Sequence, residues 1–446
     1  MRIQLSEHFN YQKLLRFTLP FILMLVFTSI YGVVDGFFVS NFVGKTPFTA
    51  VNFIMPFLMI LGSAGFMFGT GGGALIAKTL GEGKKEPANR LFSLIVYTSV
   101  VCGVVLAILG ILFIRPLAAA LGAEGRLLED SVIYGRIILA AIPACVLQYE
   151  FQCLFAVAEK PALGLYVTIA AGLTNMILDA FFVAVFHWGL PGAAAATAIS
   201  QCAGGVIPFF YFSRPNNSLL RLGKTAFDPG ALRKVCTNGS SELMSNISMS
   251  VVSMLYNIQL LKYAGEDGIA AYGVLMYVSL VFQAIFIGYS VGCAPVVGYH
   301  YGAQNHKELK GLLKKSLLLI GLFAAVMFTA SRGLAKPLSL MFVGYDEGLL
   351  NLTARAFGFF SFSFLFSGYA IFGSSFFTAL NNGLISASIS FMRTLVFQIA
   401  AVLIFPLFWG TDGIWFSIVA AEILAVLVTV FFLKSNSGKY QYGNPS

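Results

Sequence analysis

Charged residues are scarce in this chain of 446 residues. They make up 11% of it, whereas soluble domains carry about 25%, so this is not the composition of a soluble domain. The six cysteines form no CxxC pair and the four histidines have no ligand spacing, so we predict no disulfide framework and no metal site built on them. The stretch "GTGGGALIAKTLGEGKK" lacks the GxxxxGKS/T pattern and follows no strand, so it is not a phosphate-binding loop. No cofactor is therefore expected.

Apolar side chains, by contrast, make up 58% of the chain and recur in runs of about 20 residues, enough to cross a hydrocarbon core about 30 Å thick as a helix. The first run follows a polar N-terminus and has no small-residue cleavage site, so we interpret it as a retained helix. The sequence predicts an all-α polytopic membrane protein with twelve transmembrane helices. The predicted spans are 13–38, 47–77, 91–114, 131–157, 162–186, 192–212, 236–262, 269–299, 312–334, 352–378, 384–408 and 413–433.

Lysine and arginine gather in loops on one side of the predicted membrane. These loops include "KTLGEGKKEPANR", "SRPNNSLLRLGKTAFDPGALRK" and "HKELKGLLKK". Cytoplasmic loops carry such a basic excess, so we expect both termini in the cytoplasm of a bacterial or archaeal cell, with the protein in its cytoplasmic (inner) membrane. The net charge of +9 is then explained by lipid headgroups and does not indicate a nucleic-acid partner.

The two halves of the chain match each other when the sequence is shifted by 221 residues. Gly81 then falls on Gly302, and Trp188 falls on Trp409. Six helices in each half would start both lobes on the same side, so the repeats are parallel and related by a pseudo-two-fold axis along the membrane normal. Two such lobes around a central cavity are typical of an alternating-access transporter. The predicted divisions are an N-terminal lobe at 1–212, a cytoplasmic linker at 213–235 and a C-terminal lobe at 236–446.

Two aspartates lie inside predicted spans of the first lobe. Asp35 is four residues from Tyr31, and Asp179 is four residues from Asn175, so each pair shares one helix face. Both aspartates fall in the outer half of an outward-running helix, and Thr197 lies at a comparable depth. We therefore expect the two carboxyl groups to face each other. An aspartate in a span costs about 2.5–3.5 kcal/mol on insertion scales, so such residues usually have a function.

A buried pair of carboxyl groups can bind a proton or a small cation. Burial and a second carboxylate nearby both disfavour ionisation, so one group can take up a proton at one membrane face and lose it at the other. The alternative ion is Na⁺, held by oxygen atoms of Asp35, Asn175, Asp179 and Thr197. Each charge that crosses gains about 2.3 kcal/mol per 100 mV, enough to drive export of a second solute. The competing interpretation is that both aspartates are satisfied structural groups.

Other acidic residues also lie inside predicted spans. Glu150 and Glu422 are each either a hydrogen-bonded buried group or a secondary cavity charge. Glu242 either contacts a cationic substrate or caps its helix near the start. Met244 and Met276 are predicted to line an adaptable apolar cavity with it. With almost no lysine or arginine in the spans, the membrane interior is expected to carry unpaired negative charge.

These features resemble the multidrug and toxic compound extrusion (MATE) family over essentially the whole chain. The resemblance rests on the 6+6 arrangement, the helix-1 aspartate followed by "GFFVSNFVG", and the inner loops "LGEG" and "YGAQ". It is closest to the prokaryotic branch with its cation site in the first lobe, because helix 10 here contains no acidic residue. The resemblance implies coupling roles for Asp35, Asn175 and Asp179, accessory polar roles for Tyr31, Tyr134 and Thr197, and a bend of helix 1 at Pro20.

The leading hypothesis is a secondary antiporter that exports amphipathic, cationic organic compounds in exchange for H⁺ or Na⁺, and that functions as a monomer. A second is a lipid-linked saccharide flippase of the same superfamily, which would offer basic cavity residues to pyrophosphate. Arg393 is the strongest residue in its favour, although it lies near a span end where its side chain can snorkel. A membrane-embedded glycolipid transferase would need a catalytic or metal-binding motif, and none is present, so no enzyme activity is predicted.

Overall fold

The computed structural model describes residues 3–43, 45–344 and 346–442. Gly44, the last residue of the motif that follows Asp35, lies outside them. All regular elements in the described part are helical, which confirms the predicted fold class. The first half contains α1 (Tyr11–Phe38), η1 (Val39–Val43), α2 (Lys45–Gly62), α3 (Ala64–Gly81), α4 (Lys85–Ala120), α5 (Gly125–Ala140), α6 (Ile142–Val157), α7 (Pro161–Asp179), η2 (Ala180–Val185) and α8 (Gly189–Ser213). The second half contains α9 (Pro229–Gly302), α10 (His306–Val343), α11 (Glu347–Phe360), η3 (Ser361–Ser363), α12 (Phe364–Ala379), α13 (Gly383–Phe391), η4 (Met392–Val396), α14 (Phe397–Ile404), α15 (Pro406–Ser435) and α16 (Ser437–Tyr440).

The helices are long and apolar enough to cross a membrane. In the described part, ten helical stretches pass a test of length and composition, and the bent pair α5–α6 brings the total to eleven. The predicted span 236–262 is not among them. It forms the first arm of α9, and its sequence "TNGSSELMSNISMS" is rich in hydroxyl and amide side chains. A polar stretch of this kind is compatible with a membrane protein when it faces other helices or a cavity rather than lipid.

The predicted span 131–157 is bent in the structure. The chain forms α5 and α6 there, which meet at Ala141 with a bend of 57°. Pro143 explains the break, because proline has no N–H to continue the hydrogen bonds of α5 and is best accommodated in the first turn of a new helix.

Two of the predicted connections between spans are single sharp turns inside one long helical run. In α9 the turn is at Gly265, with φ 66° and ψ −155°. Residues with a side chain adopt this conformation only with strain, whereas glycine does not. In α15 it is at Gly410, with φ 55°. Gly189, which the internal repeat pairs with Gly410, also has a positive φ of 63°. The repeat seen in the sequence thus extends to the backbone conformation at this turn.

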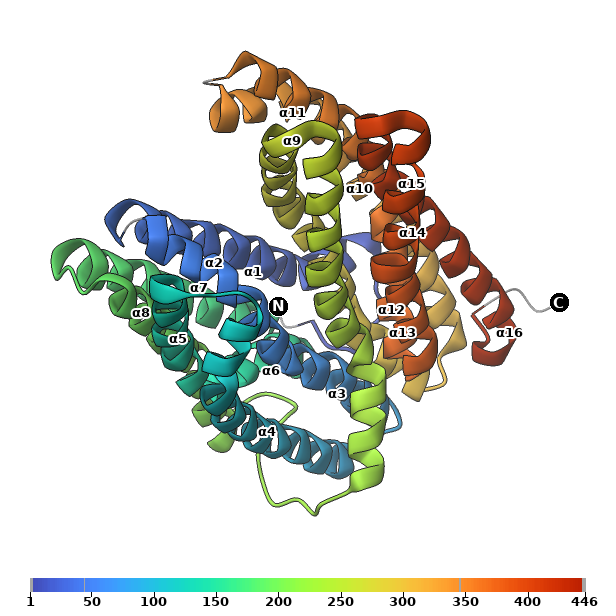
Figure 1. The fold of residues 1–446 in the computed structure, drawn as a ribbon. Helices are drawn as coiled ribbons and strands as arrows, with labels where there is room; N and C mark the ends of the chain where they lie inside the picture. Colours follow the sequence, from blue (N-terminus) through green and yellow to red (C-terminus); the bar gives the residue numbers. More distant parts are fainter. Residues whose placement is uncertain (1–2, 44, 345, 443–446) are drawn as a thin grey trace.

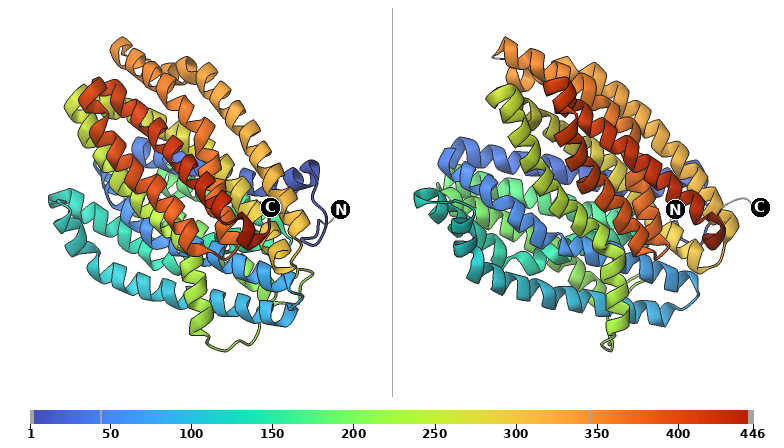
Figure 2. Two further views of the ribbon diagram at one scale, coloured as in Figure 1. Left: turned by 90° about the vertical axis from the view of Figure 1, so that its right-hand side faces the viewer. Right: turned by 45° about the vertical axis from the view of Figure 1, so that its right-hand side comes forward.

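The helices form two groups with separate cores. One cluster is made mainly by buried apolar residues of α2–α8, with the linker and the start of α9. The other is made by those of the rest of α9 to α16, together with the start of the chain and the first half of α1. A small third cluster joins Phe21 and Met24 of α1 to Ala156 of α6. Figure 1 shows the two groups as the arms of a V, joined without regular structure by residues 214–228. In Figure 2 the first described residues and α16 lie at the same end of the molecule. An even number of spans requires this arrangement.

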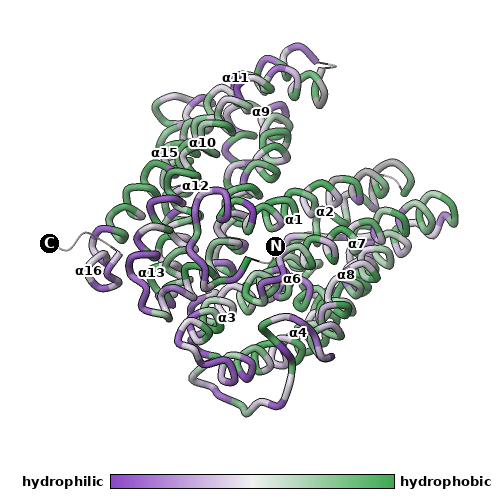
Figure 3. Tube along the Cα trace, turned by 180° about the vertical axis from the view of Figure 1, so that it is seen from behind, coloured by the Kyte–Doolittle hydropathy of each residue, from purple (hydrophilic) through white to green (hydrophobic). Residues whose placement is uncertain are grey.

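The outer surface is apolar along the middle of the helices. In α4, for example, Leu112 and Phe113 are 65% and 60% exposed. Figure 3 shows hydrophobic residues along the helical arms and hydrophilic residues in the connections near α3, α4 and α13. Such a surface is stable only in contact with lipid, so the helical arms define the membrane-embedded part of the molecule.

The two groups touch at the end that is predicted to be cytoplasmic. At this end α3 packs against both arms of α9. A Cβ atom on Gly239 would lie 2.0 Å from the Met67 carbonyl oxygen, and one on Gly302 would lie 2.0 Å from that of Lys78. The backbones therefore meet without intervening side chains. The other ends of the two groups diverge in Figure 1, so this is an arrangement closed at the predicted inner side.

A methyl group at one of these contacts should weaken the closed arrangement. We expect Gly302→Ala to lower the free energy of unfolding by about 1–3 kcal/mol, the usual effect of overpacking, because the clashing atom belongs to backbone that cannot move aside. Gly273→Ala is the control, since a Cβ there meets nothing within 4 Å. Thermal unfolding of the detergent-purified protein measures both. Equal stability of the two variants would contradict the close contact.

Candidate functional site

Three helices of the first lobe bring the predicted coupling residues together. Asp35 comes from α1, Asn175 and Asp179 from the last turns of α7, and Thr197 from α8. The Asn175 side-chain amide donates to the Thr197 hydroxyl, and that hydroxyl donates to Asp35 Oδ1, each over 3.4 Å. These long hydrogen bonds form a polar chain that connects α7 to α1 through α8.

The Asp179 carboxyl group is buried without a donor. Its side chain is 0% exposed, and neither oxygen accepts a hydrogen bond from any donor in the described part of the chain. It interacts electrostatically with Asp35, which is half-buried beside it. Two charged carboxylates in apolar surroundings repel each other and lose their hydration, so such a pair is stable only with a proton or a cation between its oxygens. The arrangement can therefore take up and release a positive charge.

Further unsatisfied oxygen atoms face the same region. Asn175 Oδ1 and the Tyr134 hydroxyl are buried and have no hydrogen-bond partner among the described residues. The Tyr134 hydroxyl interacts electrostatically with both Asp35 and Asp179. The Tyr134 hydroxyl can donate a hydrogen bond to a bound water, and Asn175 Oδ1 can accept one from it. With the carboxylates, both oxygens can also be ligands of Na⁺. In the described residues no three His, Cys, Asp or Glu side chains form a metal-binding group, so a site for a transition metal is not indicated.

Tyr31 lies at the edge of this cluster. Its ring packs against Phe27 and the Gly172 position of α7, and its hydroxyl interacts with Gln148 and Thr28. Tyr31 also interacts electrostatically with Asp35, so it belongs to the surroundings of the carboxyl pair. Pro20, the predicted bending residue, lies inside α1, which continues as one helix from Tyr11 to Phe38.

Irregular helical turns follow both aspartates, which the sequence did not predict. The wider π-helical segment η1 begins four residues after Asp35, and η2 begins directly after Asp179. Single π-turns are rare overall, but those that occur are often found at functional sites. They change the direction of side chains relative to a regular helix. No local signal in the sequence distinguishes these segments from ordinary apolar helix.

Glu242 lies elsewhere, at the closed end between the lobes. It lines a cavity of about 20 Å³ together with residues of α3, α6 and α12, among them Thr70, Cys153 and Thr378. That volume is enough for about one water molecule. Met244 and Met276 do not line this cavity, and Met276 packs against the core of the second lobe. The structure does not gather the three predicted cavity residues at one site.

Glu422 and Glu150, the other acidic residues inside predicted spans, both have partners. For Glu422 this corrects the expectation of an unpaired negative charge. Glu422 forms an ion pair with Arg393, with Nε–Oε2 and Nη2–Oε1 distances of 2.8 and 2.9 Å. The two side chains are only 5% and 13% exposed. The prediction that Arg393 snorkels from a span end is therefore wrong, because it lies in η4 inside the second lobe. Glu150 is buried and accepts a hydrogen bond from Ser99, while its Oε1 has no described partner.

Comparison with known proteins adds to this geometry. The family model described as MatE matches residues 20–181 and 243–404, which is more than half of the chain. The multidrug export protein MepA of Staphylococcus haemolyticus is 24% identical over 431 residues, covering 96% of this chain and 94% of MepA. MepA of Staphylococcus aureus strain MRSA252 is 22% identical over 425 residues, covering 95% and 93%.

Solved structures share the fold over almost the full length. A crystal structure of MATE in complex with MaL6 has a TM-score of 0.93, with 20% identity and 98% of each chain covered. The outward-facing conformation of a multidrug resistance MATE family transporter of the MOP superfamily has the same values. Both likenesses concern the arrangement of the helices.

Proposed function

This chain belongs to the MatE family of multidrug transporters, and we propose that it is a secondary antiporter that exports amphipathic, cationic organic compounds in exchange for H⁺ or Na⁺. The curated relatives are multidrug export proteins. Transport then proceeds by alternating access, with the two lobes closed at the inner side in the conformation described above. The coupling ion binds in the first lobe.

The observation that carries the proposal is the unsatisfied carboxyl group of Asp179 beside Asp35. Asp179 has no hydrogen-bond donor and faces Asp35 across the helix interface. A structural polar group would be satisfied by its neighbours, as Glu422 is by Arg393. The pair instead lacks one positive charge, and a proton or Na⁺ supplies it. Because the charge is bound deep between helices, its release to the inner side is coupled to the movement of the lobes.

The ion pair of Arg393 with Glu422 weakens the flippase hypothesis, because Arg393 was the residue most in its favour. A lipid-linked pyrophosphate needs free basic groups in the cavity, and Arg393 is already neutralised by Glu422, to which it donates three hydrogen bonds. In the predicted spans no lysine lies away from the ends. The geometry therefore supports a cationic or neutral substrate over a polyanionic one.

Transport in proteoliposomes with imposed gradients tests the proposal. We expect a fluorescent organic cation to move against its own gradient when either a pH gradient or a Na⁺ gradient is imposed, since a tenfold gradient supplies about 1.4 kcal/mol per ion. An ionophore that dissipates the ion gradient driving transport should stop the net movement of the organic cation. Absence of transport under both gradients, in vesicles shown to contain folded protein, would refute ion-coupled export.

A further inference from the structure

The segment that precedes α1 is docked into the opposite lobe. We call residues 3–10 the strap. Its side chains Leu5 and Phe9 are both 0% exposed, and both belong to the buried cluster of the second lobe. The Phe9 ring also packs edge-on against Phe17 of α1, with ring centroids 5.9 Å apart. A terminal segment is usually poorly ordered unless specific contacts hold it, so this docking requires an explanation.

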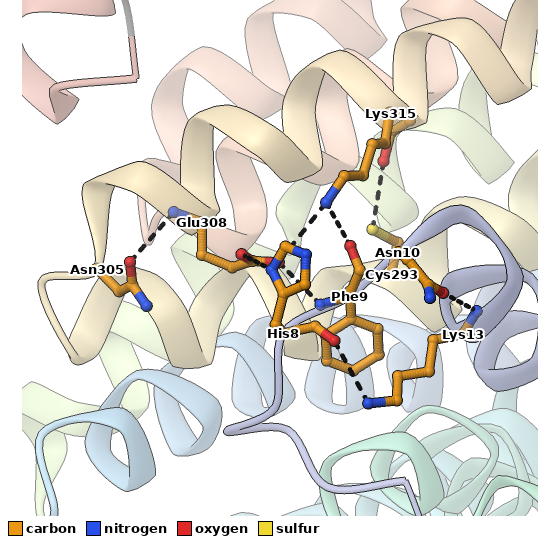
Figure 4. A network of polar contacts seen from close by, with 9 residues as sticks. His8, Phe9, Asn10, Lys13, Cys293, Asn305, Glu308 and Lys315 are labelled. Carbon is orange, nitrogen blue, oxygen red and sulfur yellow. Dashed lines mark hydrogen bonds and ion pairs between the residues drawn. The ribbon is translucent and has the colours of Figure 1, made fainter.

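Polar contacts fix the strap to α10 of the second lobe (Figure 4). Glu308 accepts a hydrogen bond from the Phe9 backbone N–H over 3.0 Å and contacts His8 Nδ1 at 2.6 Å. Lys315 donates to the Phe9 carbonyl oxygen and lies 4.0 Å from Glu308. Asn305 caps α10 by accepting from the Glu308 N–H, which holds that carboxylate in place. Both backbone groups of Phe9 are thus bonded to side chains of the same helix.

The strap is also tied to the first lobe. The Leu5 N–H donates to Glu159 Oε1 over 2.7 Å, and Glu159 lies in the turn between α6 and α7. Asn10 accepts from the Lys13 N–H at the start of α1. One short segment therefore has anchors on both lobes, at the end of the molecule where they are closed.

We propose that the strap is a lock that stabilises the arrangement closed at the inner side, and that it must release from Glu308 or Glu159 before that side opens. The two glutamates belong to different lobes, so separation of the inner ends pulls the anchors apart. The proposal rests on the alternating access of the proposed function, but it requires neither the coupling ion nor a particular substrate. Releasing the strap also exposes Leu5 and Phe9, which makes opening of the inner side less favourable.

The native Cys153 provides a test in the full-length protein. It is 4% exposed and lines the cavity between the lobes with Glu242, so a maleimide reaches it when the inner side opens. The other five cysteines are replaced by Ala or Ser, and the labelling rate is measured without substrate or gradient. We expect Phe9→Ala and Glu308→Gln each to raise the rate about tenfold or more, because each removes an anchor from the closed form only. Ser6→Ala, at an exposed strap position, is the matched control.

A second reporter separates opening from unfolding. Cys145 is buried inside the first lobe against Tyr149 and Gly62, away from the inter-lobe cavity. A version that retains only Cys145 should react slowly in every variant. Unchanged labelling of Cys153 in both strap variants would overturn the proposal, and so would an equal rise at Cys145, since the strap would then only support folding. Because no ion or substrate is present, failure of the carboxyl pair as the coupling site would leave this result unaffected.

Discussion

Asp35→Asn and Asp179→Asn are each expected to abolish gradient-driven export. Asparagine has almost the same shape as aspartate but cannot take up a proton or supply a negative charge to Na⁺. The pair would then keep its packing and lose its ability to bind the coupling ion. Initial rates of organic-cation transport into or out of proteoliposomes, under the gradient that drives the unaltered protein, should fall to the background of empty vesicles.

The control for these variants is Asp412→Asn. Asp412 pairs with Arg355 on the surface of the second lobe, and exposed pairs of this kind contribute about 0–1 kcal/mol. Its transport rate should be unchanged. Equal thermal unfolding of all three variants would show that the loss at Asp35 and Asp179 is not a loss of folding. Full transport by both variants would exclude the carboxyl pair as the coupling site.

The pseudo-symmetry of the molecule shows why only one lobe provides such a site. The shift of 221 residues places Asp35 on Tyr256 in the second lobe. The Tyr256 hydroxyl is fully buried and bonds with Gln398 at 2.7 Å and with Ser417 at 2.8 Å. The second lobe thus has a neutral, satisfied tyrosine where the first has an ionisable carboxyl group beside the unsatisfied Asp179. The same position in the repeat is structural in one half and, in the proposed function, belongs to the ion site in the other.

Which residues share a helix face with each aspartate was predictable from the sequence, because local spacing decides it. A separation of four residues puts Tyr31 with Asp35 and Asn175 with Asp179 on one helix face, and the predicted direction of each span gives the depth. The all-helical fold followed from the apolar runs in the same way. The roles of these residues remain predictions, since their placement alone does not identify a bound ion.

Contacts between distant segments were not predictable. The facing of Arg393 depends on η4, and no propensity rule predicts where a π-turn occurs. The bend at Ala141 had a visible cause in Pro143, but hydropathy alone continues through it. The docking of Phe9 against the second lobe depends on the position of α10, more than 300 residues along the chain. The Arg393 and Phe9 cases are tertiary contacts, which leave no periodic signal in the sequence.

The Arg393–Glu422 pair should produce the largest change in stability. Replacing one partner leaves the other as an uncompensated charge in apolar surroundings, and breaking a buried pair in this way costs about 3–5 kcal/mol. We expect Glu422→Leu or Arg393→Met alone to lower the free energy of unfolding by that amount. Thermal unfolding in detergent, followed by tryptophan fluorescence, measures the loss. The exposed pair Arg355–Asp412, broken by Arg355→Met, serves as the comparison and should lose no more than about 1 kcal/mol.

The double variant Arg393→Met/Glu422→Leu decides what the pair does. With both charges gone, apolar packing of similar volume can replace the ion pair at little cost, so most of the stability should return. Because the pair is not part of the proposed ion site, transport of an organic cation should also recover to near the unaltered rate. If the double variant is stable but inactive, the charge of Arg393 takes part in transport, which is the behaviour expected of a carrier for an anionic, pyrophosphate-linked substrate. A stable and active double variant restricts Arg393 and Glu422 to holding the second lobe together.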